Sequence, residues 1–290
     1  LALEAAGTTV AVLDPSTSTA RLAAWQDAYR PAAVLGFRDS ADVMDDGSPR
    51  DPLPESVLLP TSGSTGSAKF VRLTWAGLTA NAHQIGAATG IAPDDRALVH
   101  LPLHFSYGLS VLTSHLAAGA SCVLSSESAL GTAFAQVVER TSVTTLPGVP
   151  FSLELYVRTR LFARGISSLR TVTTSGGRVG KDLLAELQSQ LAPAGIGLWC
   201  MYGQTEASGR ISALPPAELV DASGSVGRAI PGTQITIEDP DESGTGTVVV
   251  HGPGNMLGYA FGAADLGTTS DPMVALDTGD LGRLDSQGRL

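Results

Sequence analysis

The sequence contains little cysteine and little charge. Its two cysteines, Cys122 and Cys200, are too few among 290 residues for a disulfide framework or a four-ligand zinc site, so a reducing cytoplasm is the expected compartment. Charged residues make up 16% and hydrophobic residues 43% of the chain, a mixture that argues against a disordered or fibrous protein. The net charge is −10 and no run of Lys or Arg occurs, so nucleic acid and anionic membranes are poor partners.

Long hydrophobic runs are also absent. The longest apolar stretch, residues 109–124, is interrupted by serine, threonine and histidine, so no membrane span is expected. The first six residues lack the basic start and the cleavage site of a secretory signal. Because the chain starts without Met inside a helix-like run and stops where a strand begins after a turn signal, we expect it to be a fragment.

Short β-branched runs alternate with longer helical patterns through the first 223 residues. The expected strands cover residues 8–13, 32–36, 56–60, 97–101, 121–124, 144–146, 171–175 and 197–201. The expected helices cover residues 19–29, 74–89, 110–117, 131–140, 150–160 and 180–191. Strands separated by helices in this rhythm form mostly parallel sheets with helices on both faces, so residues 1–223 are expected to be an α/β core.

Beyond Gly224 the helical patterns stop, and glycine, proline and short strands replace them. Strands are expected at residues 234–238, 246–251 and 279–284. We expect residues 224–290 to form a smaller β-rich, barrel-like subdomain. The stretch 40–54, rich in Asp and Pro, is expected to be a surface loop.

The most informative segment runs from Thr61 to Lys69. Small residues let backbone N–H groups approach phosphate oxygens, hydroxyls add hydrogen-bond donors, and the lysine adds positive charge. The residues expected to hold a triphosphate are Thr61, Ser62, Gly63, Ser64, Thr65, Gly66 and Lys69. The spacing of the two glycines and the lysine fails the Walker G-x-x-x-x-G-K-[ST] pattern, and a flexible linker is the alternative interpretation.

Two further segments combine a strand with an acidic residue. In residues 199–206 a strand ends in a glycine turn with Thr205 beside Glu206, and a hydroxyl next to a carboxylate suits a phosphate-bound Mg²⁺. A solvated Glu206 in an ordinary turn is the alternative. Asp280 stands at the start of a strand and could accept both hydroxyls of a ribose. A simple turn over residues 277–280 is the alternative there.

Together with Ser175–Gly177 and Gly252–Tyr259, these segments stand in the order of the adenylate-forming superfamily of AMP-dependent synthetases and ligases. The sequence resembles the large N-terminal domain of acyl-CoA synthetases, acyl-carrier-protein ligases and nonribosomal peptide adenylation domains. The resemblance covers nearly the whole chain and implies a layered αβαβα core with two mostly parallel sheets. It also implies that the C-terminal domain, with its adenylation lysine, is missing from this sequence.

The resemblance implies that ATP activates a small carboxylic acid to acyl-AMP with release of pyrophosphate. The acyl group would then pass to the thiol of CoA or of a carrier protein's phosphopantetheine. Lys69, Thr205 and Glu206 would carry catalysis, Glu206 by binding Mg²⁺, while Tyr202 would stack on adenine and Asp280 would bind the ribose. The residues flanking the adenine would be Gly177, Arg178 and Val179. The expected substrate pocket consists of Phe105, Val149, Phe151, Gly176 and Met201, and its largely apolar walls suggest an apolar acid.

Two positions depart from the family pattern. Ala68 stands where proline often precedes the loop lysine, and Phe105 stands where the family usually has His, or Asp in amino-acid activators. His104 lies one position earlier, and packing at a strand end is as plausible for it as a role at the pocket. The rival functions are a catalytically silent paralogue that binds ATP or an acyl group and an amino-acid-activating domain. A Walker-type phosphotransferase is disfavoured by the failed spacing, and an α/β-hydrolase by the lack of a G-x-S-x-G elbow.

Overall fold

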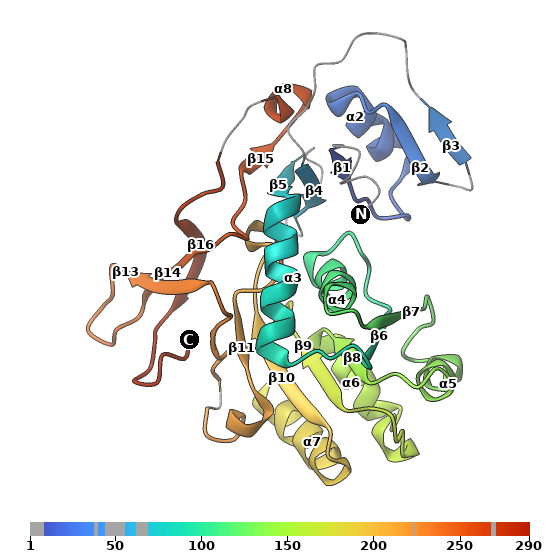
Figure 1. Cartoon of the computed structure of the whole chain (residues 1–290), viewed down its shortest axis with the longest axis vertical. Coiled ribbons are helices and arrows are strands. Elements are labelled where there is room, and N and C mark those ends of the chain that lie inside the picture. Colours follow the sequence, from blue (N-terminus) through green and yellow to red (C-terminus); the bar gives the residue numbers. More distant parts are fainter. Residues whose placement is uncertain (1–8, 38–39, 44–55, 62–68, 223, 268–270) are drawn as a thin grey trace.

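The computed structural model describes residues 9–37, 40–43, 56–61, 69–222, 224–267 and 271–290 (Figure 1). Its largest sheet is built from β6 (Arg96–Val99), β7 (Ser121–Leu124), β8 (Thr145–Gly148), β9 (Thr171–Thr174), β10 (Gly197–Tyr202), β11 (Ser212–Leu214) and β12 (Arg228–Ala229). The spatial order is β12-β11-β10-β9-β8-β6-β7. The five strands from β7 to β10 are parallel, and β11 and β12 add an antiparallel edge.

Helices cover both faces of this sheet. They are α3 (Trp75–Thr89), α4 (Ser106–Ala117), α5 (Thr132–Arg140), α6 (Pro150–Arg158) and α7 (Lys181–Leu191). Side chains alternate along β10, so Leu198 packs with α5, α6 and α7, whereas Met201 packs with Ile85 of α3 on the opposite face. In the part of the chain that the structure describes, no helix combines the length and the apolar composition needed to cross a membrane.

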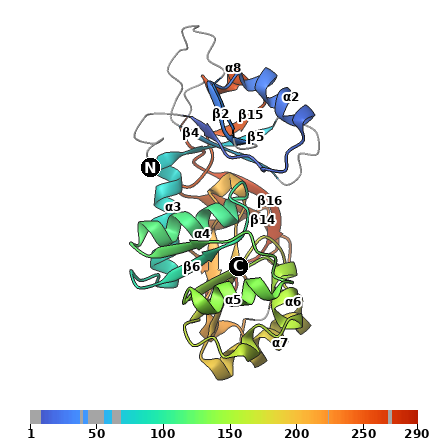
Figure 2. The ribbon, with the colours of Figure 1, turned by 90° about the vertical axis from the view of Figure 1, so that its right-hand side faces the viewer.

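A four-stranded sheet lies above the seven-stranded one in Figure 2. It contains β1 (Val10–Ala11), β4 (Ser56–Pro60), β5 (Phe70–Thr74) and β15 (Gly258–Ala260), in the order β1-β4-β5-β15. The helices α2 (Thr19–Tyr29) and α8 (Ala263–Leu266) pack on it, with the rings of Trp25 and Phe70 5.3 Å apart. Next to α2 in the chain, β2 (Ala33–Phe37) and β3 (Ser40–Val43) form an antiparallel pair.

The third sheet is antiparallel and consists of β13 (Gln234–Glu238), β14 (Gly246–His251) and β16 (Leu276–Gly282). Single 3₁₀ turns η1 (Phe162–Arg164), η2 (Ala192–Ala194), η3 (Thr205–Ala207) and η4 (Pro216–Glu218) complete the fold. One apolar cluster joins the three sheets. It contains Val57, Leu59, Val71, Leu73, Leu78, Ala207, Ile211, Ile235, Val248, Val250, Met256 and Leu276. β4, β5, β13, β14 and β16 contribute to this cluster, and Tyr202 of β10 and Ala229 of β12 pack against it, so the three sheets share one core at the place where they meet.

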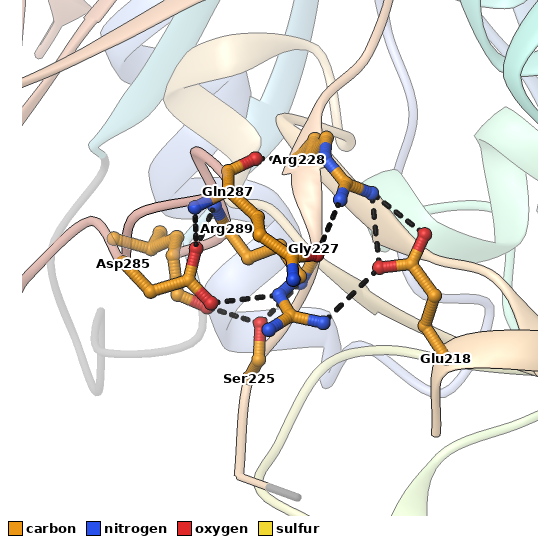
Figure 3. A network of polar contacts seen from close by, with 8 residues as sticks. Glu218, Ser225, Gly227, Arg228, Asp285, Gln287 and Arg289 are labelled. Carbon is orange, nitrogen blue, oxygen red and sulfur yellow. Dashed lines mark hydrogen bonds and ion pairs between the residues drawn. The ribbon is translucent and has the colours of Figure 1, made fainter. Parts of the chain in front are cut away.

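Charged side chains tie the last residues of the sequence to the edge of the large sheet (Figure 3). Glu218 accepts Nη1 of Arg228 at 2.7 Å and Nη1 of Arg289 at 3.3 Å, and Nε of Arg289 also meets Asp285 at 2.7 Å. These arginines, Arg228 first, lower the pKa of Glu218 below its ordinary value. Leu290 donates its backbone N–H to the Gly227 carbonyl at 2.9 Å, so the segment after β16 is fixed beside β12.

The α/β architecture expected from the sequence is confirmed. The predicted ranges 19–29, 56–60, 121–124, 234–238 and 246–251 coincide with α2, β4, β7, β13 and β14. The four-stranded sheet is mixed, with one parallel and two antiparallel pairings. β4 and β5 are antiparallel because only the short 61–69 segment joins them, and a parallel pair needs a longer crossover.

Several details differ from the expectation. Residues 40–43 form β3 instead of a loop, since they pair with β2, while the rest of 40–54 lies outside the described residues. α8 is a helix in the region expected to have none, and β5 was not anticipated. α4 begins at Ser106 and not at Ser110, where the sequence predicted its start. The prediction missed the first turn because it contains Gly108, a residue with low helix propensity. A Cβ there would lie 2.4 Å from the Pro102 carbonyl oxygen, so only glycine fits this first turn.

The small C-terminal region is an open sheet and not a barrel in the residues that the structure describes. Its polypeptide also supplies β12 to the seven-stranded sheet and β15 to the four-stranded sheet. The short strands of this region therefore complete other sheets as well as their own. The domain boundary at residue 224 stays a prediction.

The core of the large sheet supports a stability test. We expect Leu198→Ala on β10 to lower the free energy of unfolding by about 2–5 kcal/mol, because Leu198 is 2% exposed and its removal leaves a cavity. Leu124→Ala on β7 is the matched control, since Leu124 is 71% exposed and should change stability by less than about 0.5 kcal/mol. Urea unfolding measures both, and equal losses would contradict the assigned packing.

Candidate active site

The carboxyl ends of the parallel strands meet at one edge of the seven-stranded sheet. β8, β9 and β10 are parallel neighbours, and Thr174 near the end of β9 pairs with residues of both other strands. Val149, Gly176 and Thr205 therefore follow the sheet at the same edge. In open α/β sheets this edge is where ligands bind.

Lys69 and Glu206 both contact one tyrosine, Lys69 at the ring and Glu206 at the hydroxyl. Tyr259 of β15 donates its hydroxyl to Oε1 of Glu206 at 3.0 Å, and Nζ of Lys69 lies 3.5 Å from the centre of the Tyr259 ring. Burial, followed by the negative charge of Glu206, raises the pKa of Tyr259 to about 12, so its hydroxyl stays protonated and donates at neutral pH. The predicted catalytic lysine and metal carboxylate thus belong to one cluster, although 137 positions separate them in the sequence.

Thr205 faces the first turn of α4. Its Oγ1 donates to Oγ of Ser106 at 3.3 Å. The neighbouring backbone is held in an unusual shape, because Ser208 has φ 58° and a Cβ on Gly203 would lie 2.2 Å from the Gly209 carbonyl oxygen. The glycine at position 203 therefore permits the tight turn that presents Thr205 at the sheet edge.

Tyr202 and Asp280 form the second predicted pair that the structure brings together. The Tyr202 hydroxyl donates to Oδ2 of Asp280 at 2.6 Å, and the backbone N–H of Asp280 donates to Oγ1 of Thr278 at 3.2 Å. Burial, reinforced by the hydrogen bond to Asp280, raises the pKa of Tyr202. The contact joins the end of β10 to β16, where an aromatic face and a carboxylate are available to one nucleoside.

The predicted phosphate loop is described at its two ends. Ser62, Gly63, Ser64, Thr65 and Gly66 lie outside the described residues. Pro60 pairs with Phe70 across β4 and β5, so the segment starts at Thr61 and returns beside its own start at Lys69. The loop ends therefore meet next to Tyr259, which pairs with Val71 of β5.

The segment after β9 provides the predicted adenine platform. Gly176 has φ +80°, which favours glycine, and a Cβ there would lie 3.4 Å from Val149. Gly177 and Arg178 are exposed, whereas Val179 packs against the core under α5–α7. Contact of these residues with adenine stays a prediction.

The predicted acyl-pocket residues do not all converge. Phe105 and Phe151 are 45% and 64% exposed, and the Phe105 ring contacts that of His104 at 4.3 Å. The His104 side chain is buried, with Nε2 3.7 Å from Oδ2 of Asp14, and burial lowers the pKa of His104. Its environment is therefore that of a packed side chain. Met201 is buried on the α3–α4 face of the sheet.

A small cavity of about 50 Å³ lies between α3, α4 and the sheet. Met201 is the member of the predicted pocket that lines it. Beside Met201 lies the buried Arg210, whose Nε donates to the Met201 sulfur at 3.2 Å and whose guanidinium stacks 3.9 Å from the Tyr107 ring centre. Sequence reasoning missed Arg210, Ser106 and the role of Tyr259. For Tyr259 the sequence offered one signal, its place in the Gly252–Tyr259 segment. The contacts of all three residues depend on tertiary packing, which the sequence does not display.

Glu206 is suited to a metal ion that a nucleotide carries with it. Within the described ranges, no group of three or more His, Cys, Asp or Glu side chains could hold a metal by itself. Mg²⁺ usually binds through one or two carboxylates together with substrate phosphates and water. One carboxylate beside the ends of a phosphate loop fits that donor set, with the Tyr259 hydroxyl orienting Oε1 of Glu206.

Comparison with known proteins gives the class to which this fold and site belong. The family model described as AMP-binding enzyme matches residues 1–260. The chain therefore belongs to the AMP-binding enzyme family of the adenylate-forming superfamily.

Its relatives include CoA ligases. The chain is 33% identical over 272 residues to an indoleacetate–CoA ligase of Aromatoleum aromaticum, with 90% of this chain and 52% of the relative covered. It is 32% identical over 270 residues to a feruloyl-CoA synthase of an Amycolatopsis species, with 89% and 53% covered. An O-succinylbenzoate coenzyme A synthetase of Bacillus subtilis, solved in complex with ATP and magnesium ion, superposes with a TM-score of 0.69 at 25% identity over 99% of this chain and 59% of that one. The chain thus spans about half the length of the curated relatives it matches.

The tyrosines of and around the site predict an alkaline transition. Burial raises the pKa of all five tyrosines, that of Tyr259 to about 12. The folded state then holds these protons more tightly than the unfolded chain, so stability is complete below about pH 10 and falls as the pH rises through 10 toward 12. Phenolate absorbance should appear above about pH 11 in the folded protein and near pH 10 in denaturant. Coincident titrations would contradict the burial of these hydroxyls.

Proposed function

We propose that the protein of which this chain is a part uses ATP to activate a carboxylic acid to acyl-AMP, releases pyrophosphate and transfers the acyl group to a thiol. The observation that carries the proposal is the cluster of Lys69, Tyr259 and Glu206 beside Thr205 at the carboxyl edge of the sheet. A cation and hydroxyl groups beside a glycine-rich loop suit a triphosphate, and a carboxylate suits the Mg²⁺ that a triphosphate carries.

The proposed roles follow from the chemistry of the side chains. Lys69 and the loop from Thr61 bind the β- and γ-phosphates, and Thr205 donates to the α-phosphate, where the carboxylate attacks. Asp280 accepts the ribose hydroxyls, and Tyr202 lies against the adenine. The reaction gains its rate mainly from the positioning of the two reactants and from stabilisation of the charge on phosphorus and its oxygens.

Mg²⁺ and ATP are the proposed cofactors. Glu206 would hold the ion, which supplies positive charge to the phosphates during substitution at phosphorus. The contact from Tyr259 orients Oε1 of Glu206. The ATP and magnesium in the Bacillus subtilis synthetase support this assignment.

CoA is the proposed acceptor, because the relatives quoted above are named as CoA ligases or synthases. A carrier-protein thiol is the second acceptor to test. The presence of Lys69, Thr205, Glu206 and Asp280 supports an active enzyme over a silent paralogue. Acid-dependent pyrophosphate release by the full-length protein, measured over aliphatic, aromatic and dicarboxylic acids, tests the proposal. Release of ADP, or no release with any acid, would refute it.

Removal of the Glu206 carboxylate should abolish activation. We expect Glu206→Ala to lower Mg²⁺-dependent pyrophosphate release by about 100-fold or more, because an oriented ligand to the charge-compensating ion is lost. Circular dichroism should show an unchanged fold, since Glu206 is half-exposed. The matched control is Glu186→Ala on the exposed face of α7, which should keep full activity. Full activity of Glu206→Ala at saturating Mg²⁺ would remove the assignment.

Amino acids should be poor substrates. Phe105 occupies the position at which amino-acid activators usually have Asp, so an α-ammonium group meets no carboxylate there. An unpaired charge costs about 3 kcal/mol or more, which corresponds to about 100-fold in kcat/KM. The measurement compares phenylalanine with 3-phenylpropionate, which differ by the amino group. A preference for the amino acid would identify an amino-acid-activating domain.

A further inference from the structure

Arg210 is a buried cation without a carboxylate partner. Arg210 follows the Thr205–Ser208 turn in the sequence, and the residue is 3% exposed. Nε donates to the Met201 sulfur, Nη1 donates to the Gly209 carbonyl at 3.0 Å, and the guanidinium stacks on Tyr107. Every ion pair that the structure describes lies elsewhere, so Arg210 has neutral partners only.

This arrangement is unfavourable unless an anion completes it. Burial lowers the pKa of Arg210 to about 10, with the nearby Tyr107 acting in the opposite direction, and the group remains charged at neutral pH. A buried charge normally has an opposite charge beside it, because neutral hydrogen-bond partners replace only part of its hydration. Guanidinium groups bind carboxylates well, since their donors match the two oxygens.

Arg210 lines the cavity between the α3–α4 pair and the large sheet. The cavity extends from Met201 to Thr171, and the β9–β10 register places Thr171 four residues below the level of Met201, roughly 13 Å at 3.3 Å per residue. Several hydroxyl groups lie in its wall. The hydroxyl side chains that line it are Thr89, Ser110, Ser114, Thr145, Thr171 and Thr173. A wall of this kind suits an acid with a polar group within its chain or at its far end.

One polar atom of the cavity wall has no hydrogen-bond partner. Nδ1 of His115 lies 2.9 Å from the Val111 carbonyl, which can only accept, so Nδ1 carries the proton and Nε2 is an acceptor. Nε2 is buried and makes no hydrogen bond in the structure. Burial lowers the pKa of His115, so the ring is neutral at pH 7. The cavity therefore presents Arg210 as a donor and His115 as an acceptor.

Contacts through α4 connect Arg210 to the candidate reaction centre. Tyr107, on which Arg210 stacks, follows Ser106, and the Ser106 hydroxyl receives the hydrogen bond of Thr205. Gly209, which precedes Arg210, approaches Ser106 so closely that a Cβ would lie 2.9 Å from the Ser106 carbonyl oxygen. Arg210 is thus linked to Thr205, where the reacting carboxylate is proposed to lie, through Gly209, Ser106 and Tyr107.

We propose that Arg210 binds a second carboxylate of the substrate, so that the acid activated at this site is a dicarboxylic acid. This inference rests on the proposed function and names its substrate class. Asp95 is the carboxylate among the residues that line the cavity, and it does not pair with Arg210. It lies just before β6, at the opposite ends of the strands, and pairs with Arg170 at 2.7 Å.

The test compares straight-chain dicarboxylic acids of about four to eight carbons with their monomethyl esters. Each pair has nearly the same length and differs in the charge at one end. Binding to the full-length protein is measured by calorimetry, and acid-dependent ATP–pyrophosphate exchange is measured with the same compounds. We expect at least one dicarboxylate to bind ten times more tightly than its half-ester or better, with the same order in exchange.

The variants are Arg210→Met, which removes the charge at similar volume, and Arg210→Lys, which keeps it. We expect the dicarboxylate to half-ester affinity ratio to fall to about one in Arg210→Met and to be partly restored in Arg210→Lys. The matched control is Arg72→Met, because Arg72 is equally buried but lies on β5, where Asp265 acts on it electrostatically. Its affinity ratio should equal that of the wild type, and thermal melting checks that each variant folds.

The outcomes separate this inference from the proposed function. Pyrophosphate exchange with monocarboxylic acids and no preference for dicarboxylates would overturn the inference and leave the function intact. Arg210-dependent dicarboxylate binding without exchange would refute the function and support the site. If Arg210→Met does not fold, the wild-type comparison of diacid and half-ester decides alone, and equal binding of the two overturns the proposal.

Discussion

The apolar cluster in which the three sheets meet fixes the relative positions of the candidate site residues. Ala207 and Ile211 enter this cluster from the segment after β10, so they anchor the turn that carries Glu206. Val71 and Leu73 enter it from β5, directly after Lys69, and Leu276 enters it from β16, which carries Asp280. Burial of these side chains therefore stabilises the fold and the site together, because the polar groups extend from the ends of elements whose apolar residues are shared.

The sequence predicted those parts of the site that are local in the chain. Thr205 and Glu206 follow a strand because an apolar run ends there in a glycine turn, and that pattern can be recognised in a short window. The pairing of Tyr202 with Asp280 could be anticipated only through the family resemblance, since 78 positions separate them. The fold was predictable to a similar degree, because periodic segments such as 19–29 carry their own signal whereas the short strand β15 depends on its partner β5.

Arg210 illustrates why the rest was not predictable. Its sequence neighbours are small or apolar residues, and nothing in them distinguishes a surface arginine from a buried one. Its burial depends on two residues that are distant in the sequence, Tyr107 of α4 and Met201 of β10, which contact the guanidinium group in the folded chain. The apolar pocket expected from Phe105 and Phe151 met the same difficulty, since both rings are exposed.

Two cations of the site share one structural solution. Lys69 rests on the ring of Tyr259 and Arg210 on the ring of Tyr107, in contrast to Arg170 and Arg228, which pair with carboxylates. An aromatic face attracts a cation without neutralising its charge. In a chain with a net charge of −10, this leaves both cations available to an incoming anion.

The position of Lys69 on an aromatic ring affects how easily its amine can be acylated. Acyl-adenylates are electrophiles that also react with amines, so an enzyme that forms one exposes its own lysines to acylation. The sequence contains two lysines, Lys69 and Lys181, and Lys181 begins α7. For Lys69, the ring of Tyr259 covers one side of Nζ at 3.5 Å. In the proposed function, the contact that positions this charge for phosphate would also limit the approach of an electrophile to the nitrogen.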